Sequence, residues 1–265
     1  MTDTPIGAKL DTSVPHSARV WNYWLGGKDH YQVDRDAAEA MLAIYPAYGI
    51  KARTCRYFLF RAVHFLTVEA GVRQFLDIGT GLPTAENTHE VAQRFAPESR
   101  IVYVDNDPLV LAHARSLLTS SPEGVTRYVD ADLRDPDRIL AEARQTLDFK
   151  APIALLLLGV LGHVADYDLA LAIVRKLVDA LPSGSYLVHC DGTTTNDAYV
   201  KALEDYKDTG GIPYIPREHE QVIGYFAGLE MVEPGVVPIH RWRPEPGLVG
   251  VPAAVDESGG IGRKP

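Results

Sequence analysis

From residue 73 onward, short apolar runs alternate with stretches of helical periodicity, and this alternation constrains the fold of the chain more than any other feature. Five runs are rich in Val, Ile, Leu and Tyr, as strands buried on both faces are: "QFLDIG", "RIVYVDND", "VTRYVDAD", "IALLLLG" and "GSYLVHCD". Between them lie four stretches with helical spacing of apolar residues: "PTAENTHEVAQRFA", "DPLVLAHARSLLTS", "DPDRILAEARQTL" and "YDLALAIVRKLVDAL". The alternation predicts an α/β fold with a Rossmann-like, doubly wound and mostly parallel sheet.

The residues on either side of this alternation have other patterns. Before it, we predict helices over 18–25, 34–44 and 50–70, ended by Gly26-Gly27, Pro46 and Gly71. After the fifth strand, we expect a helix in "TTTNDAYVKALEDY" and another over 217–227. "LEMVEPGVVPIHRW" and the tail then resemble closing strands, as an antiparallel pair at one edge of the sheet.

Charge and composition exclude several kinds of partner. A net charge of −9 disfavours a protein that coats nucleic acid or an anionic membrane. The longest uncharged apolar run, residues 151–164, is shorter than the roughly 20 residues of a spanning helix and is better read as a buried strand and a loop. The first 20 residues lack an apolar segment of signal-peptide length. Cys55 and Cys190 have no metal-ligand spacing and favour two reduced thiols. We therefore expect a cytoplasmic protein with no bound metal.

The ends of the predicted strands carry the clearest functional signal, because ligands of such sheets bind beyond the carboxyl ends of the strands. The first strand ends at Asp77-Ile78-Gly79-Thr80-Gly81, where the glycines let a ligand approach the backbone. The second ends at Asp105, and a carboxylate accepts hydrogen bonds from both hydroxyls of a ribose.

The same positions disfavour a nicotinamide dinucleotide. Thr84 stands where a dinucleotide fingerprint needs its third glycine, and Asp77 would repel a pyrophosphate. Asp132 and Asp135 add negative charge to an edge that carries no clear phosphate partner. S-adenosylmethionine fits better, since it combines an adenine and a ribose with a sulfonium and an ammonium. Asp77 and the glycines would then receive the cationic methionine end.

Seven stretches spread over nearly the whole chain carry a family resemblance: "ARVWNYWLGGKDHYQVDRDAA", "FLDIGTGLPTAENTHEVAQ", "IVYVDNDPLVLAHARSLL", "ADLRDPDRIL", "ALLLLGVLGHV", "LPSGSYLVH" and "VEPGVVPIHRWRP". Together they resemble the actinobacterial S-adenosyl methyltransferase family, formerly a domain-of-unknown-function family, within the class I S-adenosylmethionine-dependent methyltransferases. Two positions depart from the pattern expected of that family. Cys55-Arg56 replaces an Asn-Arg pair, and "VHCDGTT" is an unusual ending for the fifth strand.

The resemblance implies roles for particular residues. It implies that Asp77, Gly79, Thr80 and Gly81 line the methionine end of the cofactor and that Asp105 holds the ribose hydroxyls. Asn106 would lie along the adenine, and Asp132 would accept from the adenine amino group with Leu133 against the ring. Gly159 would lie near the transferred methyl group. Within "LGGKDHYQVDR" and just before it, Tyr23, Gly27, Lys28 and Asp29 belong to the family signature and imply contact with cofactor or substrate.

Two polar stretches leave alternatives open. Asn87 and Thr88, in the first turns of the helix after the glycine turn, either reach the methionine carboxylate or form a polar helix face. Arg53, Arg56 and Arg61 have helical spacing, which is typical of a solvated face; alternatively, one of them pairs with a carboxylate of the cofactor or acceptor.

His163 is the first candidate for a catalytic residue, because it follows the fourth strand, where acceptors are held. A histidine with a pKa near neutrality can remove a proton from a hydroxyl or an amine. A structural, hydrogen-bonded role is equally open for His163, and His189 is a weaker candidate base. Methyl transfer requires no dedicated catalytic residue, since the sulfonium already activates the methyl carbon and in-line positioning supplies much of the rate.

We therefore expect a single methyltransferase domain over residues 1–265, with an N-terminal helical cover (1–72), a Rossmann-like cofactor-binding core (73–200) and a C-terminal helix with closing strands (201–265). It would transfer a methyl group from S-adenosylmethionine to a small molecule and leave S-adenosylhomocysteine. The tetrad of nucleic-acid amino-methyltransferases is absent after the fourth strand, where the chain reads "LLGVLGHV". The alternative is a non-catalytic S-adenosylmethionine-binding sensor or an inactive partner protein.

Overall fold

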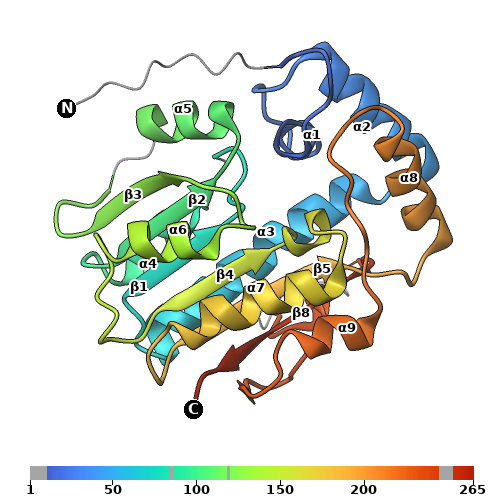
Figure 1. Cartoon of the computed structure of the whole chain (residues 1–265). Coiled ribbons are helices and arrows are strands. Elements are labelled where there is room, and N and C mark those ends of the chain that lie inside the picture. The colour runs from blue at the N-terminus through green and yellow to red at the C-terminus, as the bar shows by residue number, and fades with distance from the viewer. Residues whose placement is uncertain (1–10, 84–85, 118–119, 245–252) are drawn as a thin grey trace.

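The computed structural model describes residues 11–83, 86–117, 120–244 and 253–265, and Figure 1 shows how its elements are arranged. The helices are α1 (Ser17–Trp24), α2 (Gln32–Ile44), α3 (Tyr48–His64) with the π-helical turn η1 (Phe65–Glu69), α4 (Thr88–Phe95), α5 (Pro108–Leu117), α6 (Pro136–Ala143), η2 (Leu161–His163), α7 (Tyr167–Asp179), α8 (Asp197–Lys207), α9 (His219–Gly224) and η3 (Ile239–Arg241). The strands are β1 (Gln74–Ile78), β2 (Arg100–Asp105), β3 (Val125–Asp130), β4 (Ala154–Leu158), β5 (Tyr186–Gly192), β6 (Glu230–Met231), β7 (Val237–Pro238) and β8 (Glu257–Arg263).

The sheet has the predicted doubly wound, mostly parallel form. Its strand order is β3-β2-β1-β4-β5-β8-β6, and β7 also pairs with β8. The first five strands are parallel, with Leu76 in register with Val102 on one side and Leu155 on the other. The order reverses between β1 and β4, which places a topological switch point beside the end of β1.

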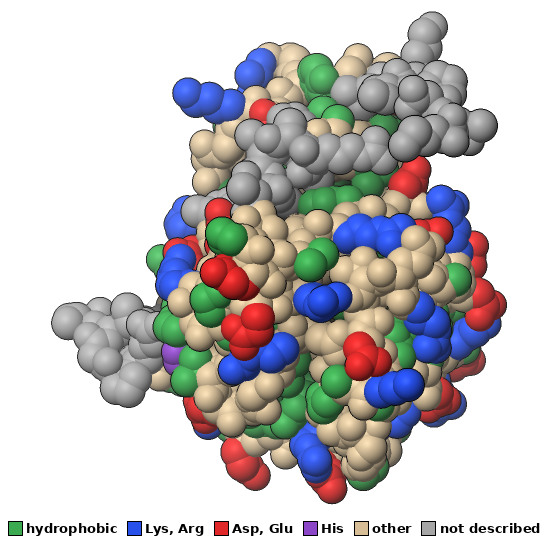
Figure 2. Space-filling view, turned by 90° about the vertical axis from the view of Figure 1, so that its left-hand side faces the viewer, with side chains coloured by type: hydrophobic (Ala, Val, Ile, Leu, Met, Phe, Trp, Pro, Cys, Tyr) green, Lys and Arg blue, Asp and Glu red, His purple; other side chains and the backbone are tan. Residues whose placement is uncertain are grey.

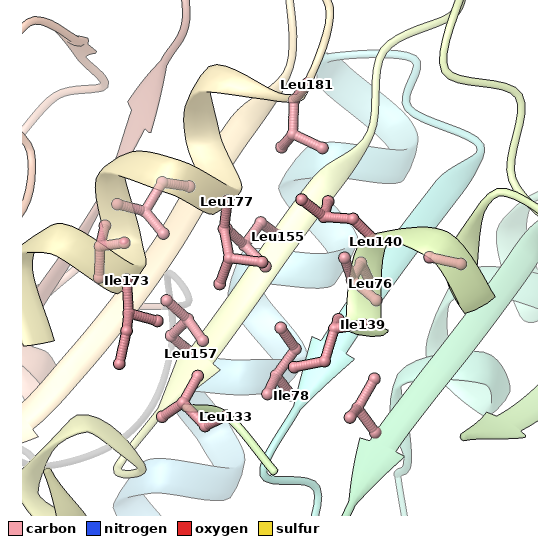
Figure 3. Close-up of a cluster of buried hydrophobic side chains, with 14 of the residues drawn as sticks. Leu76, Ile78, Leu133, Ile139, Leu140, Leu155, Leu157, Ile173, Leu177 and Leu181 are labelled. Atoms are coloured by element: carbon pink, nitrogen blue, oxygen red, sulfur yellow. The ribbon is translucent and has the colours of Figure 1, made fainter. Parts of the chain in front are cut away.

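Helices cover both faces of the sheet, as a parallel sheet requires (Figure 1). On one face, apolar side chains of β1 and β4 point toward α6 and α7 (Figure 3). The labelled members of this cluster are Leu76, Ile78, Leu133, Ile139, Leu140, Leu155, Leu157, Ile173, Leu177 and Leu181. On the other face, the second half of α3 packs with α4, and Phe58, Leu66 and Trp242 are buried there.

A third apolar cluster joins α1, α2, the first half of α3 and α8 above the carboxyl ends of the strands (Figure 1). Trp24 and Tyr48 stack within it at a centroid distance of 4.3 Å. Because α3 contributes to this cluster and also to the sheet-facing one, it fixes the position of the helical cover over the strand ends.

The predicted starts of two helices are confirmed. Asp107 Oδ1 accepts a hydrogen bond from the Leu109 amide at 2.8 Å, and Asp135 caps α6 with Pro136 at its first position. Other boundaries were wrong. The helix expected over 83–96 begins at Thr88, because Asn87 and Glu90 form a capping box there, while residues 84–85 lie outside the described ones.

The closing strands differ from the expected edge pair. Strand β8 lies inside the sheet, antiparallel to β5 on one side and to β6 and β7 on the other. Glycines 259, 260 and 262 leave almost no room for side chains: a Cβ at Gly259 would lie 2.5 Å from the Cys190 Cβ. Strand β8 therefore needs glycine at these positions, because its neighbours approach too closely for larger residues.

Two further properties bear on possible partners. Among the described helices, none is long and apolar enough to cross a bilayer. The face in Figure 2 carries Lys and Arg side chains interspersed with Asp and Glu, without a continuous basic area among the described residues.

Candidate active site

A cavity of about 250 Å³ lies at the carboxyl ends of the parallel strands, beneath α1. The strand-end residues predicted from the sequence line it together: Asp77, Gly79, Thr80, Gly81, Thr88, Asp105, Asn106, Asp132, Leu133, Gly159 and His163. They converge because β1 to β5 are parallel, so that their carboxyl ends meet at one edge of the sheet.

The two glycines of the turn after β1 are needed for different structural reasons. Both have left-handed backbones, with φ of 76° at Gly79 and 64° at Gly81. A Cβ at Gly79 would lie 2.3 Å from Cγ2 of Val160, so packing against the loop after β4 excludes a side chain. A Cβ at Gly81 would meet no described atom within 4 Å, which leaves this part of the cavity free for a ligand.

Asp77 places a buried carboxyl group beside this turn. Its side chain is 5% exposed, and its Oδ2 accepts a 2.6 Å hydrogen bond from the Thr88 hydroxyl. Burial raises the pKa of Asp77 to about 6, against the opposing effects of Thr88 and the Arg56 guanidinium. A carboxylate that ionises this reluctantly favours a cationic ligand.

Arg56 also lines the cavity instead of a solvated face, as the second of the two alternatives for the α3 arginines requires. Its Nη2 donates to the Glu86 carbonyl at 2.7 Å, and its charge acts on Asp77. Of the three α3 arginines expected on a solvated face, only Arg53 is exposed, while Arg61 donates to the Trp242 and Ile239 carbonyls. α3 lies against the sheet, so its Arg56 side faces the strand ends. The cavity wall therefore carries positive as well as negative charge.

Asp105 is held by backbone amides on both oxygens. Oδ2 accepts from the Gly81 amide and Oδ1 from the Asp107 amide, each at 2.9 Å. A carboxylate oxygen has a second lone pair, so both oxygens can still accept from a ligand. Burial raises the pKa of Asp105.

Asp132 and Leu133 follow β3 at the far side of the cavity. Arg134 forms a two-point ion pair with Asp132, with contacts of 2.9 Å to Oδ1 and 2.6 Å to Oδ2. These hydrogen bonds hold the pKa of Asp132 below its usual value. Leu133 is buried and packs in the apolar cluster of the sheet, so one of its faces is available to a planar ring.

Helix α1 forms the wall opposite the strand ends. Its residues Ser17, Ala18, Trp21 and Asn22 face the cavity at helical spacing, as does Leu25, which directly follows the helix. Just before the helix, His16 Nδ1 lies 2.9 Å from Asp107 Oδ2, which connects the start of α1 to the residues that follow β2. No pattern in the sequence selected this face of the helix, because the expected contacts lay in the next turn.

Three residues expected at the cofactor lie elsewhere. Tyr23 falls on the opposite side of α1 from Trp21 and donates to Glu39 at 2.9 Å, and Lys28 is exposed. Gly27 leaves room for the Asn22 side chain, whose Oδ1 also accepts from the Asp29 amide at 2.9 Å. The "GGKD" segment thus supports Asn22 rather than lining the cavity itself.

His163 and His189 occupy different environments. His163 Nδ1 lies 3.0 Å from the Pro213 carbonyl, which only accepts, so Nδ1 carries the proton. Burial lowers the pKa of His163, and its ring lines the cavity. His189, by contrast, is fully buried in β5 with its Nδ1 2.8 Å from the Leu157 carbonyl, and it is outside the cavity wall. The interpretation of His189 as a base was therefore wrong.

A smaller cavity of about 40 Å³ adjoins the first and shares Ser17, Trp21 and His163 with it. Most of its remaining wall is aromatic and comes from α1, α3, α8 and the segment after α8: Trp24, Tyr48, Tyr199, Tyr206 and Tyr214. None of these residues carried a functional signal in the sequence, because their spacing is that of ordinary core positions.

Cys55, Cys190 and Glu257 complete the wall beside β4 and were not predicted either. Both cysteines are free, and their thiols hydrogen-bond to each other. Glu257 begins β8 in the glycine-rich tail, where nothing in the local sequence marks it as part of a site.

A mostly parallel sheet in this strand order, with antiparallel β8 beside β5, its switch point at a glycine turn and an acid at the end of the next strand, has the arrangement of a class I methyltransferase fold. An S-adenosylmethionine-dependent methyltransferase from Anabaena variabilis shares this fold at a TM-score of 0.53 and 12% identity, over 77% of this chain and 84% of that one. Residues 3–265 match the model of the S-adenosyl methyltransferase family, and the chain belongs to that family.

Two solved structures are similar over almost their full length. A DUF574 family protein from Streptomyces avermitilis is 44% identical, with a TM-score of 0.92 over 97% of this chain and 100% of that one. A putative methyltransferase from Thermobifida fusca is 39% identical, with a TM-score of 0.87 over 99% of both chains. No curated protein matches the sequence significantly. The family assignment identifies the chain as an S-adenosylmethionine-dependent methyltransferase and confirms the expected cofactor.

Proposed function

We propose that the 250 Å³ cavity binds S-adenosylmethionine with Asp77 at its cationic methionine end and Asp105 at its ribose. The observation that carries this orientation is the buried Asp77 carboxyl, whose pKa is raised to about 6 beside an open glycine turn. The spare lone pairs of Asp105 suit two hydroxyls. The remaining contacts in this proposal are Gly79, Thr80, Gly81, Thr88, Asn106, Asp132, Leu133 and Gly159.

In this arrangement the protein contributes mainly position and charge. When bound, S-adenosylmethionine supplies a methyl carbon whose bond to sulfur breaks as the acceptor lone pair bonds to it, so that neutral S-adenosylhomocysteine remains. Asp77 balances positive charge, and Arg56 is placed to pair with a ligand carboxylate. α1 covers the cavity and keeps water from the acceptor.

We further propose that His163 Nε2 takes the proton that an N–H or O–H acceptor loses. Its Nδ1 proton is directed at the Pro213 carbonyl, which leaves Nε2 unprotonated. Because burial lowers the pKa of His163, the neutral form persists to a lower pH than in an ordinary histidine.

His163→Asn should therefore lower kcat by roughly 100-fold with an accepted substrate, within the usual range for a general base. The affinity for S-adenosylmethionine should not change. The acid limb of the wild-type pH–rate profile should lie below the ordinary histidine pKa, since protonation abolishes the base only below the lowered value. Steady-state kinetics across pH measure both effects; an unchanged kcat would show that His163 is structural.

The acceptor in this proposal is a small molecule handled by a single cytoplasmic domain, with the helical cover, core and closing strands at 1–72, 73–200 and 201–265. Three observations support it. The cavity wall includes α1 itself, the net charge is −9, and the face in Figure 2 mixes both signs of charge. Nucleic-acid binding depends on neutralising many phosphates with Lys and Arg, which this balance disfavours.

The function is tested by following S-adenosylhomocysteine release with a panel of small amines, phenols, alcohols and carboxylic acids. Single- and double-stranded DNA and RNA form the comparison set, and the Asp77→Asn variant gives the background. We expect release above background with members of the small-molecule set only. Turnover confined to nucleic acid would contradict the small acceptor, and binding of S-adenosylmethionine with no turnover at all would favour the non-catalytic sensor.

A further inference from the structure

Glu257 presents one buried carboxylate oxygen to the cavity without a partner. The side chain is 2% exposed, and its Oε1 has no hydrogen-bond partner among the described residues. This oxygen lies 4.0 Å from the position that a Cβ on Gly159 would occupy, at the loop that follows β4. Glu257 and Gly159 both line the 250 Å³ cavity.

The other oxygen of Glu257 is held in place. Oε2 forms an ion pair with Lys51 Nζ, and the Lys51 side chain is itself 2% exposed. Nζ also lies 3.5 Å from the Asp256 carbonyl and 4.8 Å from the centroid of the Tyr199 ring. With Oε2 fixed on α3, Oε1 keeps a constant direction toward the cavity.

A buried acceptor atom left without a hydrogen bond is unfavourable, and a charged one more so. Such an atom persists in a native structure where a ligand or a function requires it. A donor group on a ligand beside Gly159 would remove the penalty at Glu257 Oε1.

The position of β8 decides which ligand can reach this oxygen. In the strand order, β8 follows β5, so β2 and β8 are separated by four strand spacings. At about 4.8 Å each, these amount to roughly 19 Å. Asp105 and Asp132 lie at the β2 and β3 end of the cavity, whereas Glu257 shares the opposite end with Gly159 and Cys190. The proposed function puts the ribose at the Asp105 end, and its proposed base, His163, follows β4 as Gly159 does, so the acceptor belongs at the Gly159 end.

We propose that Glu257 Oε1 accepts a hydrogen bond from an N–H or O–H group of the methyl acceptor, so that the substrates are amines, alcohols or phenols. An attacked amine keeps a second N–H for His163, whereas an attacked hydroxyl gives its one proton to His163 and a neighbouring hydroxyl or amine donates to Glu257. The inference rests on the proposed orientation of S-adenosylmethionine in the same cavity. Lys51 acts as a positioning residue that aims the carboxylate. The aromatic cavity beside Trp21 and His163 accommodates the rest of the acceptor.

Extended cofactor analogues test this without knowledge of the natural acceptor. In these probes a nitrogen replaces the sulfur of S-adenosylhomocysteine and carries a chain of two, three or four carbons that ends in an amine, a hydroxyl or a methyl group. Isothermal titration of the full chain should show, at the best length, at least roughly tenfold tighter binding of the amine- and hydroxyl-ended probes than of the methyl-ended probe. The net free energy of a hydrogen bond to a charged group corresponds to a factor of this size in affinity.

Glu257→Gln should abolish the preference for the amine-ended probe, because its amide oxygen replaces Oε2 at Lys51 and its NH₂ group then faces a protonated amine that can only donate. The hydroxyl-ended probe can still accept from that NH₂ group, so the amine-ended probe is the one that decides. Glu257→Asp keeps the charge but withdraws the oxygen, and should weaken the preference. Glu230→Gln, at an exposed glutamate of β6 that pairs with Arg263, is the matched control and should behave as wild type. Thermal unfolding verifies that each variant is folded, and the affinity for S-adenosylhomocysteine should be unchanged in all of them.

No preference in wild type at any chain length would overturn the inference, as would a preference for the amine-ended probe that survives Glu257→Gln in a folded variant. If Glu257→Gln does not fold, the wild-type comparison and Glu257→Asp decide alone. Failure of the wild-type protein to bind S-adenosylhomocysteine is a different result, because it contradicts the proposed function itself.

Discussion

Asp77→Asn should stabilise the ligand-free protein while it weakens the binding of S-adenosylmethionine. The pKa of Asp77 rises from 3.8 to about 6 in the folded chain, so ionisation at higher pH disfavours the folded state. A shift of this size corresponds to about 3 kcal/mol. The favourable contribution of the protonated carboxyl is complete below pH 3.8 and is lost as the pH rises through about 6. Asparagine avoids that loss and can still accept the Thr88 hydrogen bond.

Urea unfolding at pH 8 should therefore show a gain approaching 3 kcal/mol for Asp77→Asn, and the gain should shrink at pH 5. In the same variant the affinity for S-adenosylmethionine should fall by roughly 100-fold at pH 8, as expected when one partner of a buried charge pair is removed. Asp130→Asn, at an exposed acid of β3, is the control and should change neither quantity. A variant that binds normally, or one that loses stability at pH 8, would contradict the assigned role of Asp77.

Alanine at the two turn glycines should separate folding from binding. Gly79→Ala combines a strained left-handed backbone with a Cβ 2.3 Å from Val160, and should destabilise the protein by about 3 kcal/mol. Gly81→Ala carries only the backbone strain, about 1 kcal/mol, because no described atom lies within 4 Å of its Cβ. The added methyl group of Gly81→Ala points into space that the ligand needs, so affinity for S-adenosylmethionine should fall by roughly tenfold or more.

Urea unfolding and isothermal titration of both variants provide the comparison. Each variant serves as the control for the other, since both place alanine at positive φ within the same turn. Equal stability of the two variants would show that the contact of Gly79 with Val160 does not limit packing. Normal binding by Gly81→Ala would show that the ligand does not approach this part of the backbone.

Much of the sheet and one wall of the cavity could be predicted from the sequence. The strands that carry Asp77 and Asp105 are continuous apolar runs, and polar residues directly after them must lie at the sheet edge. Asp107 and Asp135 mark helix starts through local hydrogen bonds to the next turn, so their roles follow from neighbouring residues alone.

The opposite wall depends on contacts between residues far apart in the chain. Which side of α1 faces the cavity is set by its packing on α2 and α3, so Trp21 and Asn22 could not be distinguished from Tyr23 beforehand. The spacing of Arg56 in the sequence is that of a solvated arginine, and only the packing of α3 against the sheet shows that its side chain lines the cavity. Glu257 lies in β8, whose sequence lacks the apolar pattern of a strand because the close approach of neighbouring elements requires glycine at several of its positions.

The central claim is that the cavity at the strand ends binds S-adenosylmethionine through Asp105, the last residue of β2. Isothermal titration of the wild type, Asp105→Ala and Asp130→Ala with S-adenosylmethionine tests it most directly. Asp105 and Asp130 are register partners on adjacent strands, but only Asp105 lines the cavity. We expect micromolar binding by the wild type and Asp130→Ala, and loss of that binding in a folded Asp105→Ala. No binding by folded wild-type protein, or equal binding by all three, would contradict the claim.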